Sequence, residues 1–276
     1  FTEFFESSNS EGGFYLPTEN VEWTTGFWTG VIWLAYEYTG EACFKEAAES
    51  QVESFLKRIR EKIDVNHHDM GFLYSLSCVA AYKLTGSSHA REAALLAADH
   101  LAGRYRENGR FIQAWGNVNE PSEYRLIIDC LLNLPLLYWA SEQWKDPRFY
   151  NAAVRHADTV RRTLVRRDGS CGHIAALDPC TGELERLLPG QGYSADSAWS
   201  RDQSWIIYGF VLSYIHTGDG HYLNTAKRIA HYCMANTPEN GLIPVDFRQP
   251  AECAWEDSTA AAIASCGLIE LSRHTE

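Results

Sequence analysis

The sequence predicts a mainly helical protein in which helices follow one another in pairs. Segments with the apolar spacing of an α-helix end in an aromatic-rich turn with glycine, at 36–40, 82–86 and 214–218, and an alanine-rich segment follows each turn. Glycine directly after the last periodic residue is typical of a helix C-cap, so we expect each unit to be a helical hairpin. A series of such hairpins, closed on itself, forms an α/α toroid.

The remaining elements are expected in order along the chain. The second helices of the pairs are expected at 44–48, 89–98 and 222–230, with looser copies of the whole pattern at 138–153 and 268–274. The turns are further apart than the roughly 34 residues of a helical solenoid repeat, so substantial loops should join the hairpins. Short strands are expected inside these loops, at 109–115 and at 171–174.

Composition narrows the class of protein. The chain has 276 residues, 45% of them hydrophobic, without an uninterrupted apolar run of about 20 residues, so a membrane-spanning protein is not expected. A net charge of -12 without a stripe of lysine and arginine argues against nucleic acid or an anionic membrane as partner. Nine tryptophans and 14 tyrosines are more than a core needs, and aromatic rings commonly form the surfaces that bind sugars.

The eight cysteines are scattered singly, and no two of them form a C-x-x-C pair. We expect them to be mainly reduced, buried, small hydrophobic side chains in a cytoplasmic protein. Cys171 and Cys180 are close enough in sequence for a loop disulfide, and that alternative stays open. The chain begins at Phe1 rather than at methionine, so the absence of a visible signal peptide carries little weight.

Polar and aromatic residues gather where the first helix of each pair is expected to begin. They form four stretches, at 23–28, 67–72, 123–129 and 193–205. Parallel first helices would bring these stretches to one mouth of the toroid, where the tryptophans are either core residues or walls for a ligand. Helix N-termini carry partial positive charge and free N–H groups, which favours an anionic ligand at this mouth.

Asp129 stands inside the apolar run 126–132, with Arg125 as its nearest basic neighbour. An unpaired buried carboxylate is costly, and burial raises the pKa of a carboxyl group. A carboxylic acid that stays protonated near neutral pH is suited to donate a proton, so Asp129 is the first candidate for catalysis. A purely structural pair with Arg125, one helical turn earlier, is the alternative.

The other polar candidates also have structural alternatives. Asp69 precedes a helical pattern, so it is either a carboxylate of the site or a plain N-cap. His67, His68 and His173 lack the spacing of a metal site, and neither a metal nor a cofactor is expected. Arg201 at a helix start opposes the helix dipole unless it faces a carboxylate.

Four blocks of sequence, in this order, resemble glycoside hydrolase family 88, the unsaturated glucuronyl hydrolases. They are WTTGFWTG at 23–30, NHHDMGF at 66–72, RLIIDCLLNLPLLYWA at 125–140 and QGYSADSAWSRDQSWIIYGF at 191–210. The resemblance extends over 23–271. It implies an all-α (α/α)6 barrel, which agrees with the helical hairpins that the periodicity predicts independently.

The resemblance also implies an activity. Such an enzyme removes a 4,5-unsaturated uronic acid from the non-reducing end of glycosaminoglycan-type oligosaccharides left by polysaccharide lyases. One aspartate protonates carbon 4 of the enol ether and helps water to add at carbon 5. Asp129 matches this acid/base position, and Asp69 matches the second carboxylate of the family. The matching substrate-binding positions are Trp23 and Trp115 as stacking walls, His68 and His173 as polar contacts, and Gln191, Arg201 and Trp205 around the uronate.

The chain departs from the family pattern at two positions. Gly190 stands where the family usually has histidine before Gln-Gly-Tyr, and Asp202 stands where a glycine follows the arginine. The first change is expected to remove a substrate contact, and the second to add a negative charge beside an anion site. We expect one catalytic domain over 1–276, incomplete at its C-terminus because the last hairpin of the barrel is lacking.

Other functions are compatible with parts of this pattern. An unsaturated rhamnogalacturonyl hydrolase would act on pectin fragments by the same hydration chemistry, although RDQSW at 201–205 favours the glucuronyl branch. A non-catalytic carbohydrate-binding relative would explain the two departures, and a metal hydrolase is a third class. The expected partner is an unsaturated oligosaccharide, with no nucleic acid or membrane partner, and the expected assembly is a monomer or a weak homo-oligomer.

Overall fold

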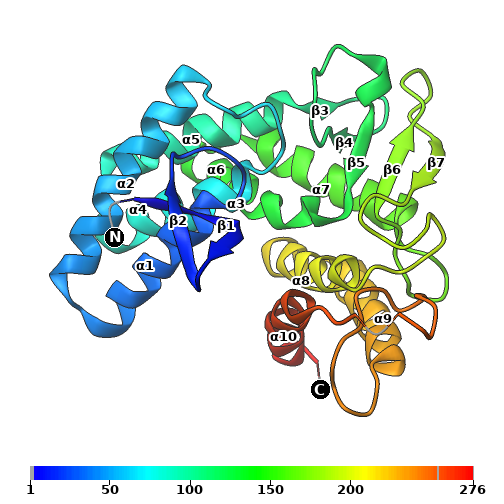
Figure 1. Cartoon of the computed structure of the whole chain (residues 1–276). Coiled ribbons are helices and arrows are strands. Elements are labelled where there is room, and N and C mark those ends of the chain that lie inside the picture. The colour runs from blue at the N-terminus through cyan, green and yellow to red at the C-terminus, as the bar shows by residue number, and fades with distance from the viewer. Residues whose placement is uncertain (1–2, 254, 276) are drawn as a thin grey trace. The chain divides into compact units, whose positions relative to one another are not determined.

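The computed structural model describes residues 3–253 and 255–275, and helices dominate this part of the chain (Figure 1). The chain divides into two compact units. Unit 1 comprises 1–104 and 135–149, and unit 2 comprises 105–134 and 150–276. None of the described helices combines the length and the apolar character that crossing a bilayer requires.

Unit 1 starts with an antiparallel pair of strands that the sequence pattern does not predict. These are β1 (Phe4–Glu11) and β2 (Phe14–Thr18), drawn in dark blue in Figure 1. The helices that follow are α1 (Thr25–Thr39), α2 (Ala42–Glu61), α3 (Met70–Tyr74), the π-helix η1 (Ser75–Val79), α4 (Ala80–Thr85) and α5 (Ser88–Gly103). Most of α6 (Leu134–Trp144) also belongs to this unit.

Unit 2 combines helices with short strands. Its helical segments are the 3-10 helices η2 (Pro121–Glu123) and η3 (Ile128–Asn133), most of α7 (Pro147–Thr163), α8 (Ser200–Thr217), α9 (Gly220–Asn236) and α10 (Ser258–Ser272). Its strands are the pair β3 (Tyr105–Arg106) and β4 (Phe111–Ile112), and the antiparallel sheet β5 (Arg125–Ile127), β6 (Ile174–Leu177) and β7 (Leu184–Leu188). The strands expected near 109–115 and 171–174 are present. The stretch 125–127, expected at a helix start, is a strand instead.

Glycine ends three first helices where the sequence predicts it. Gly40, Gly86 and Gly218 are C-caps in the left-handed conformation, with φ of 72°, 74° and 72°. Glycine adopts this conformation without the steric cost that a Cβ brings. A second helix begins two residues after each cap, so the helical hairpins expected at these turns are confirmed.

The first helices of unit 1 approach one another closely at Gly26. A Cβ at this position would lie 2.4 Å from the carbonyl oxygen of Phe72, which is closer than any real Cβ contact. Glycine therefore allows the start of α1 to pack against α3. This contact places the loop before α1 beside the loop before α3.

A buried arginine also holds these two loops together. Arg58 on α2 is 1% exposed, and its guanidinium donates to the carbonyl oxygens of Glu22 at 2.8 Å and Asp64 at 2.7 Å. It also donates to Asn20 Oδ1 at 3.1 Å and to Thr25 Oγ1 at 3.2 Å. A buried charge is tolerated only when its hydrogen bonds are satisfied, and here the partners are the loops themselves.

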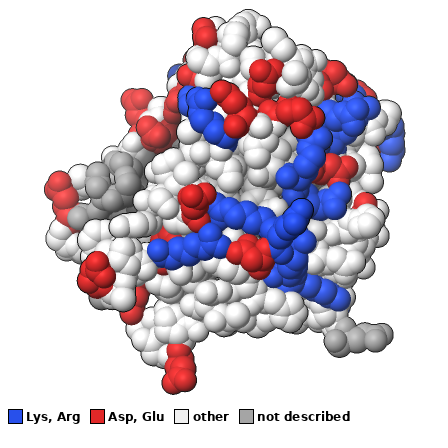
Figure 2. Space-filling model, turned by 90° about the vertical axis from the view of Figure 1, so that its right-hand side faces the viewer, with Lys and Arg blue, Asp and Glu red and all other residues white. Residues whose placement is uncertain are grey.

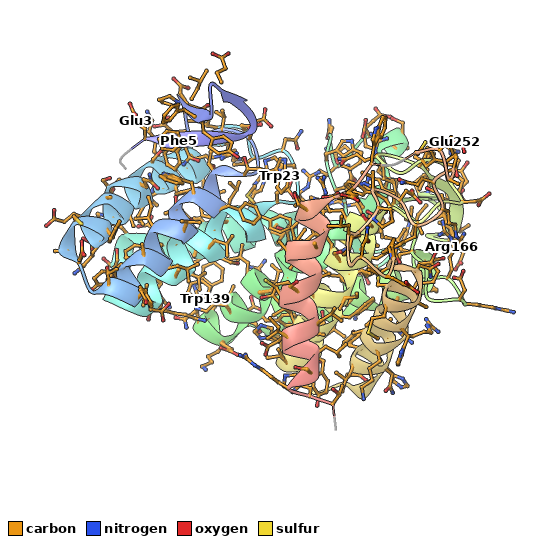
Figure 3. All side chains as sticks on the ribbon, turned by 60° about the horizontal axis from the view of Figure 1, so that its bottom comes forward. Glu3, Phe5, Trp23, Trp139, Arg166 and Glu252 are labelled. Carbon is orange, nitrogen blue, oxygen red and sulfur yellow. The ribbon has the colours of Figure 1, made fainter. Side chains whose placement is uncertain are left out.

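The half-buried Arg166, labelled in Figure 3, joins two segments of unit 2 in a similar way. Its guanidinium donates to the carbonyl oxygens of Cys171 at 3.1 Å, Ser197 at 2.9 Å and Ala195 at 2.9 Å. These acceptors lie in the segment before β6 and in the loop before α8. Both segments therefore share one cationic anchor.

The cysteines are free thiols throughout the described chain. The buried ones are Cys78, Cys130, Cys171 and Cys233, and the exposed ones are Cys43, Cys180 and Cys266. The expected reduced state is therefore present, and the alternative of a disulfide between Cys171 and Cys180 is wrong. The expectation of burial holds for some of them only.

We predict that the loops of unit 1 depend on the Arg58 guanidinium. Arg58→Met should lower the free energy of unfolding by about 3–5 kcal/mol, because it leaves several buried acceptors without a donor. Arg60→Met on the same helix is the matched control, since the Arg60 side chain is 54% exposed and should cost less than about 1 kcal/mol. Urea denaturation measures both, and equal losses would contradict the assignment.

Candidate active site

Asp69 lies between two histidine rings in unit 1. It is the N-cap residue of α3, yet its side chain makes no capping hydrogen bond, so the plain N-cap interpretation is wrong. Its Oδ2 is 2.9 Å from His67 Nδ1, and its Oδ1 is 3.2 Å from His68 Nε2. Burial alone would raise the pKa of Asp69, but the charge of His68 and the hydrogen bond from His67 outweigh burial and hold it below its ordinary value. Asp69 is therefore an ionised carboxylate at neutral pH.

An aromatic cluster stands beside this carboxylate. Trp23 lies in the segment before α1 (Figure 3). It is 39% exposed. Its ring centroid lies 5.6 Å from that of Phe72 and 5.9 Å from that of Phe27. Phe72 follows Asp69 by one helical turn, so the indole and the carboxylate lie at the same end of α3. Phe27 and Phe72 carry no polar group, and no sequence signal separates them from core aromatics.

The sheet of unit 2 brings Asp129 next to His173. Ile127 at the end of β5 pairs with Ile174 at the start of β6, and the N–H of Ile128 donates to the carbonyl of His173 at 3.1 Å. Asp129 follows β5 and His173 precedes β6, so both residues lie at one end of this antiparallel pair. Asp129 occupies the first turn of η3 and is half-buried, whereas Ile128 is fully buried.

Arg125 does not serve as a structural partner of Asp129. It lies in β5, forms an ion pair with Glu123, and stacks 4.5 Å above the ring centroid of Trp115. The extended backbone at Arg125 removes the helical spacing on which the alternative pairing rests, and the described residues show no such pair. The half-buried Trp115 is held to the sheet, because the N–H of the preceding Ala114 donates to the carbonyl of Arg125 at 3.0 Å.

Arg201 finds its carboxylate inside the chain. Its Nε donates to Asp257 Oδ2 at 2.8 Å, and its guanidinium lies 4.9 Å from the ring centroid of Trp199. Asp257 in turn caps α10 by accepting from the N–H of Ala260 at 3.0 Å. The unfavourable position of Arg201 at a helix start is thus offset by Asp257. The side chain is 35% exposed, so it is accessible to an anion as well.

Gln191 and Trp205 are the remaining predicted residues, and their positions do not by themselves define their roles. Gln191 is exposed in the loop before α8, and Trp205 is half-buried on α8 one turn after Arg201. The candidates in unit 1 are Trp23, His68 and Asp69, and the candidates in unit 2 are Trp115, Asp129, His173, Gln191, Arg201 and Trp205. The binding roles of all of them stay predictions.

Asp202 differs most from expectation. It is 1% exposed in the first turn of α8, and its Oδ1 lies 2.7 Å from His173 Nδ1. Burial raises the pKa of Asp202 to about 6; the hydrogen bond from His173 opposes this rise, and the negative charges of Asp129 and Asp246 add to it. The sequence places this carboxyl group beside an anion site, and the structure shows it buried against a histidine.

Positive charge is local rather than general. Figure 2 shows lysine and arginine side chains gathered on one face, with acidic residues among them. In unit 2 a groove is lined by Arg110, Arg155, Arg161 and Arg162, together with Asp158 and Thr159. An acidic chain of net charge -12 therefore still presents cations to an anionic ligand.

Comparison with known proteins gives a consistent result. The sequence matches the model of Glycosyl Hydrolase Family 88 over residues 3–267. It is 42% identical over 276 residues to the unsaturated chondroitin disaccharide hydrolase of Streptococcus pneumoniae. The aligned region covers 99% of this chain and 69% of that protein. It is 45% identical over 260 residues to the unsaturated glucuronyl hydrolase of Bacillus sp., covering 94% of this chain and 69% of that protein.

A solved structure matches as closely. The crystal structure of the unsaturated glucuronyl hydrolase from Bacillus sp. GL1 superposes with a TM-score of 0.95 and 43% identity, covering 100% of this chain and 73% of that one. Together with the helical content described above, this likeness confirms the α/α-barrel fold class.

We predict that Asp202 makes stability depend on pH in a defined direction. A carboxyl group whose pKa is raised by folding favours the folded state only while it is protonated, so this contribution is complete below about pH 4 and is lost as pH rises through about 6. Relative to Asp202→Asn, the natural chain should lose roughly 3 kcal/mol between these pH values. Urea denaturation of both proteins across this range measures the difference, and a difference that is constant with pH would contradict it.

Proposed function

The chain belongs to Glycosyl Hydrolase Family 88, and we propose that it releases the 4,5-unsaturated uronic acid from the non-reducing end of glycosaminoglycan-type oligosaccharides. The chain is a glycosidase of this family. The relatives named above are an unsaturated chondroitin disaccharide hydrolase and an unsaturated glucuronyl hydrolase, and the latter is described as responsible for the degradation of glycosaminoglycan. The observation that carries the proposal is a half-buried carboxyl group, Asp129, placed beside His173 in a chain so similar to these enzymes.

In the proposed reaction Asp129 is both acid and base. Its carboxylic acid transfers a proton to carbon 4 of the enol-ether double bond, and the positive charge that develops at carbon 5 is shared with the ring oxygen. Water adds to carbon 5 and returns a proton to Asp129, so one water is consumed and the acid is regenerated. The hemiketal opens to a ketone, and the hemiacetal left at carbon 1 releases the sugar. Support for this role is the position of Asp129, between the buried residues Ile128 and Cys130 and therefore partly shielded from bulk water.

The other residues are proposed to bind and orient the sugar. Asp69, kept ionised by its histidines, accepts hydrogen bonds from sugar hydroxyls. Arg201 meets the uronate carboxylate, because a planar guanidinium offers parallel donors to a planar anion. The proposed stacking walls are Trp23 and Trp115, and the proposed polar or flanking contacts are His68, His173, Gln191 and Trp205.

Several properties of the protein stay predictions from its sequence. These are the cytoplasmic location, a single catalytic domain, a monomer or weak homo-oligomer, and the absence of nucleic acid, membrane, metal and cofactor partners. The proposed partner is the unsaturated oligosaccharide substrate.

We predict that the purified protein prefers a glucuronyl substrate. Hydration of the double bond removes its ultraviolet absorbance, so turnover is followed directly. An unsaturated chondroitin disaccharide should give a kcat/KM at least about tenfold above that of unsaturated galacturonyl-rhamnose, since the two disaccharides differ in the glycosidic linkage and in the sugar attached to the unsaturated uronate. The reverse preference would identify a rhamnogalacturonyl hydrolase. Binding of the disaccharide without decay of absorbance would identify a non-catalytic relative, and activity lost to a strong chelator would identify a metal hydrolase.

We predict that turnover requires the Asp129 carboxyl group. Asp129→Asn keeps the shape of the side chain but cannot cycle a proton, so kcat should fall by about 100-fold to 10,000-fold while the thermal unfolding transition is retained. Asp99→Asn is the control, because Asp99 is 54% exposed and its ion pair with Arg148 lies outside the proposed site. Undiminished activity of Asp129→Asn would rule out the assignment.

A further inference from the structure

The His173 ring is confined on several sides within unit 2. Its Nδ1 is 2.7 Å from Asp202 Oδ1, and its ring lies edge-to-face against Trp199, with 4.9 Å between centroids and 76° between planes. The side chain is 5% exposed. In the described part of the chain its Nε2 makes no hydrogen bond. Nδ1 is therefore hydrogen-bonded within the protein, whereas Nε2 is available to a ligand.

Gly190 forms another wall of this enclosure. A Cβ built at Gly190 would lie 1.8 Å from His173 Cδ2 and 2.5 Å from His173 Nε2. Contacts this short cannot be relieved by small shifts, so the ring has its observed position only because residue 190 has no side chain. The φ of +55° at Gly190 also favours glycine.

Asp202 is a rigid acceptor for the ring. The first turn of α8 is fixed because the N–H of Ser200 donates to the carbonyl of Val245 at 2.9 Å. Asp202 Oδ2 is buried without a hydrogen-bond partner in the described residues, so the carboxyl group interacts with the chain chiefly through Oδ1 and His173. An ionised carboxylate accepts a hydrogen bond, which places the imidazole proton on Nδ1 and leaves Nε2 with a lone pair.

We propose that Gly190 and Asp202 are positioning residues, which hold the His173 ring in one orientation and one tautomer so that its Nε2 accepts a hydrogen bond from a sugar hydroxyl of the substrate. This proposal rests on the proposed function, since it assigns the hydroxyl to an unsaturated oligosaccharide bound beside Asp129. Gly190 and Asp202 then act on the same ring. The glycine leaves room for the His173 ring, and the aspartate holds the ring in that position.

A buried Asp–His pair with a merely structural role would have different consequences. It would affect stability but not the proton position on a substrate-facing nitrogen. The effect of removing such a pair on kcat/KM would also be the same with and without His173. Both differences are measurable.

The proton position is read by nitrogen NMR of protein labelled at its ten histidines. At pH 8, above the pKa of Asp202, His173 in the natural chain should show a protonated Nδ1 and an unprotonated Nε2. Asp202→Ala should shift the tautomer toward protonated Nε2, and Gly190→Ala should do the same by displacing the ring. His173→Asn identifies the signals. Protonated Nε2 in the natural chain, or unchanged signals in Asp202→Ala, would overturn the proposal.

The catalytic consequence is tested by a double-mutant cycle. Asp202→Ala and Gly190→Ala should each lower kcat/KM by about 10-fold to 100-fold, the usual effect of removing the partner that orients a site histidine. His173→Asn keeps a hydrogen-bond donor for Asp202 and thereby favours folding. In this background each change should lower kcat/KM by less than about threefold. Equal losses of kcat/KM in the natural and in the His173→Asn background would overturn the proposal.

Gly241→Ala is the matched control for backbone strain. Gly241 has φ of +75° in the same unit, but a Cβ there would meet nothing within 4 Å. It should therefore leave both the NMR signals of His173 and kcat/KM unchanged. If the natural chain hydrates no unsaturated disaccharide, the proposed function fails, and the NMR experiment still decides whether Gly190 and Asp202 hold the ring.

Discussion

The loops that carry the candidate residues depend on two guanidinium groups, those of the buried Arg58 and the half-buried Arg166. Arg58 gathers the backbone carbonyls before α1 and α3, and Arg166 gathers those before β6 and α8. Loops of this kind have no hydrogen-bond ladder of their own, so their carbonyls need donors from elsewhere. A single arginine supplies several donors in a fixed plane, which holds the two loops in each unit at a constant spacing.

Much of the fold could be predicted from the sequence because the signals for it are local. Glycine after an aromatic-rich helix end determined the turns at Gly40, Gly86 and Gly218, and their left-handed backbone is a property of those few residues. The strand β5 was not predicted, because Arg125–Ile127 looks equally apolar in a helix and becomes a strand only by pairing with β6.

The site was predictable as a set of residues but not as a set of contacts. The blocks around Asp69 and Asp129 mark where polar side chains interrupt apolar periodicity. Sequence order could not show that Asp202 reaches His173 across 29 positions, or that Asp257 would neutralise Arg201. Such partners lie far apart in sequence and meet only through tertiary packing, so Asp202 looked like an unfavourable charge until its neighbour was known.

The buried thiols have a consequence for how local opening can be observed. Burial raises the pKa of Cys78 in unit 1 and of Cys233 in unit 2, in both cases to about 12, so neither is a thiolate at neutral pH. A thiol-specific reagent can therefore react with these side chains only after the surrounding helices separate. Cys43, Cys180 and Cys266 are accessible without such motion and report the intrinsic labelling rate. The labelling rates of Cys78 and Cys233 would thus report local opening in unit 1 and in unit 2, with the surface thiols as the reference.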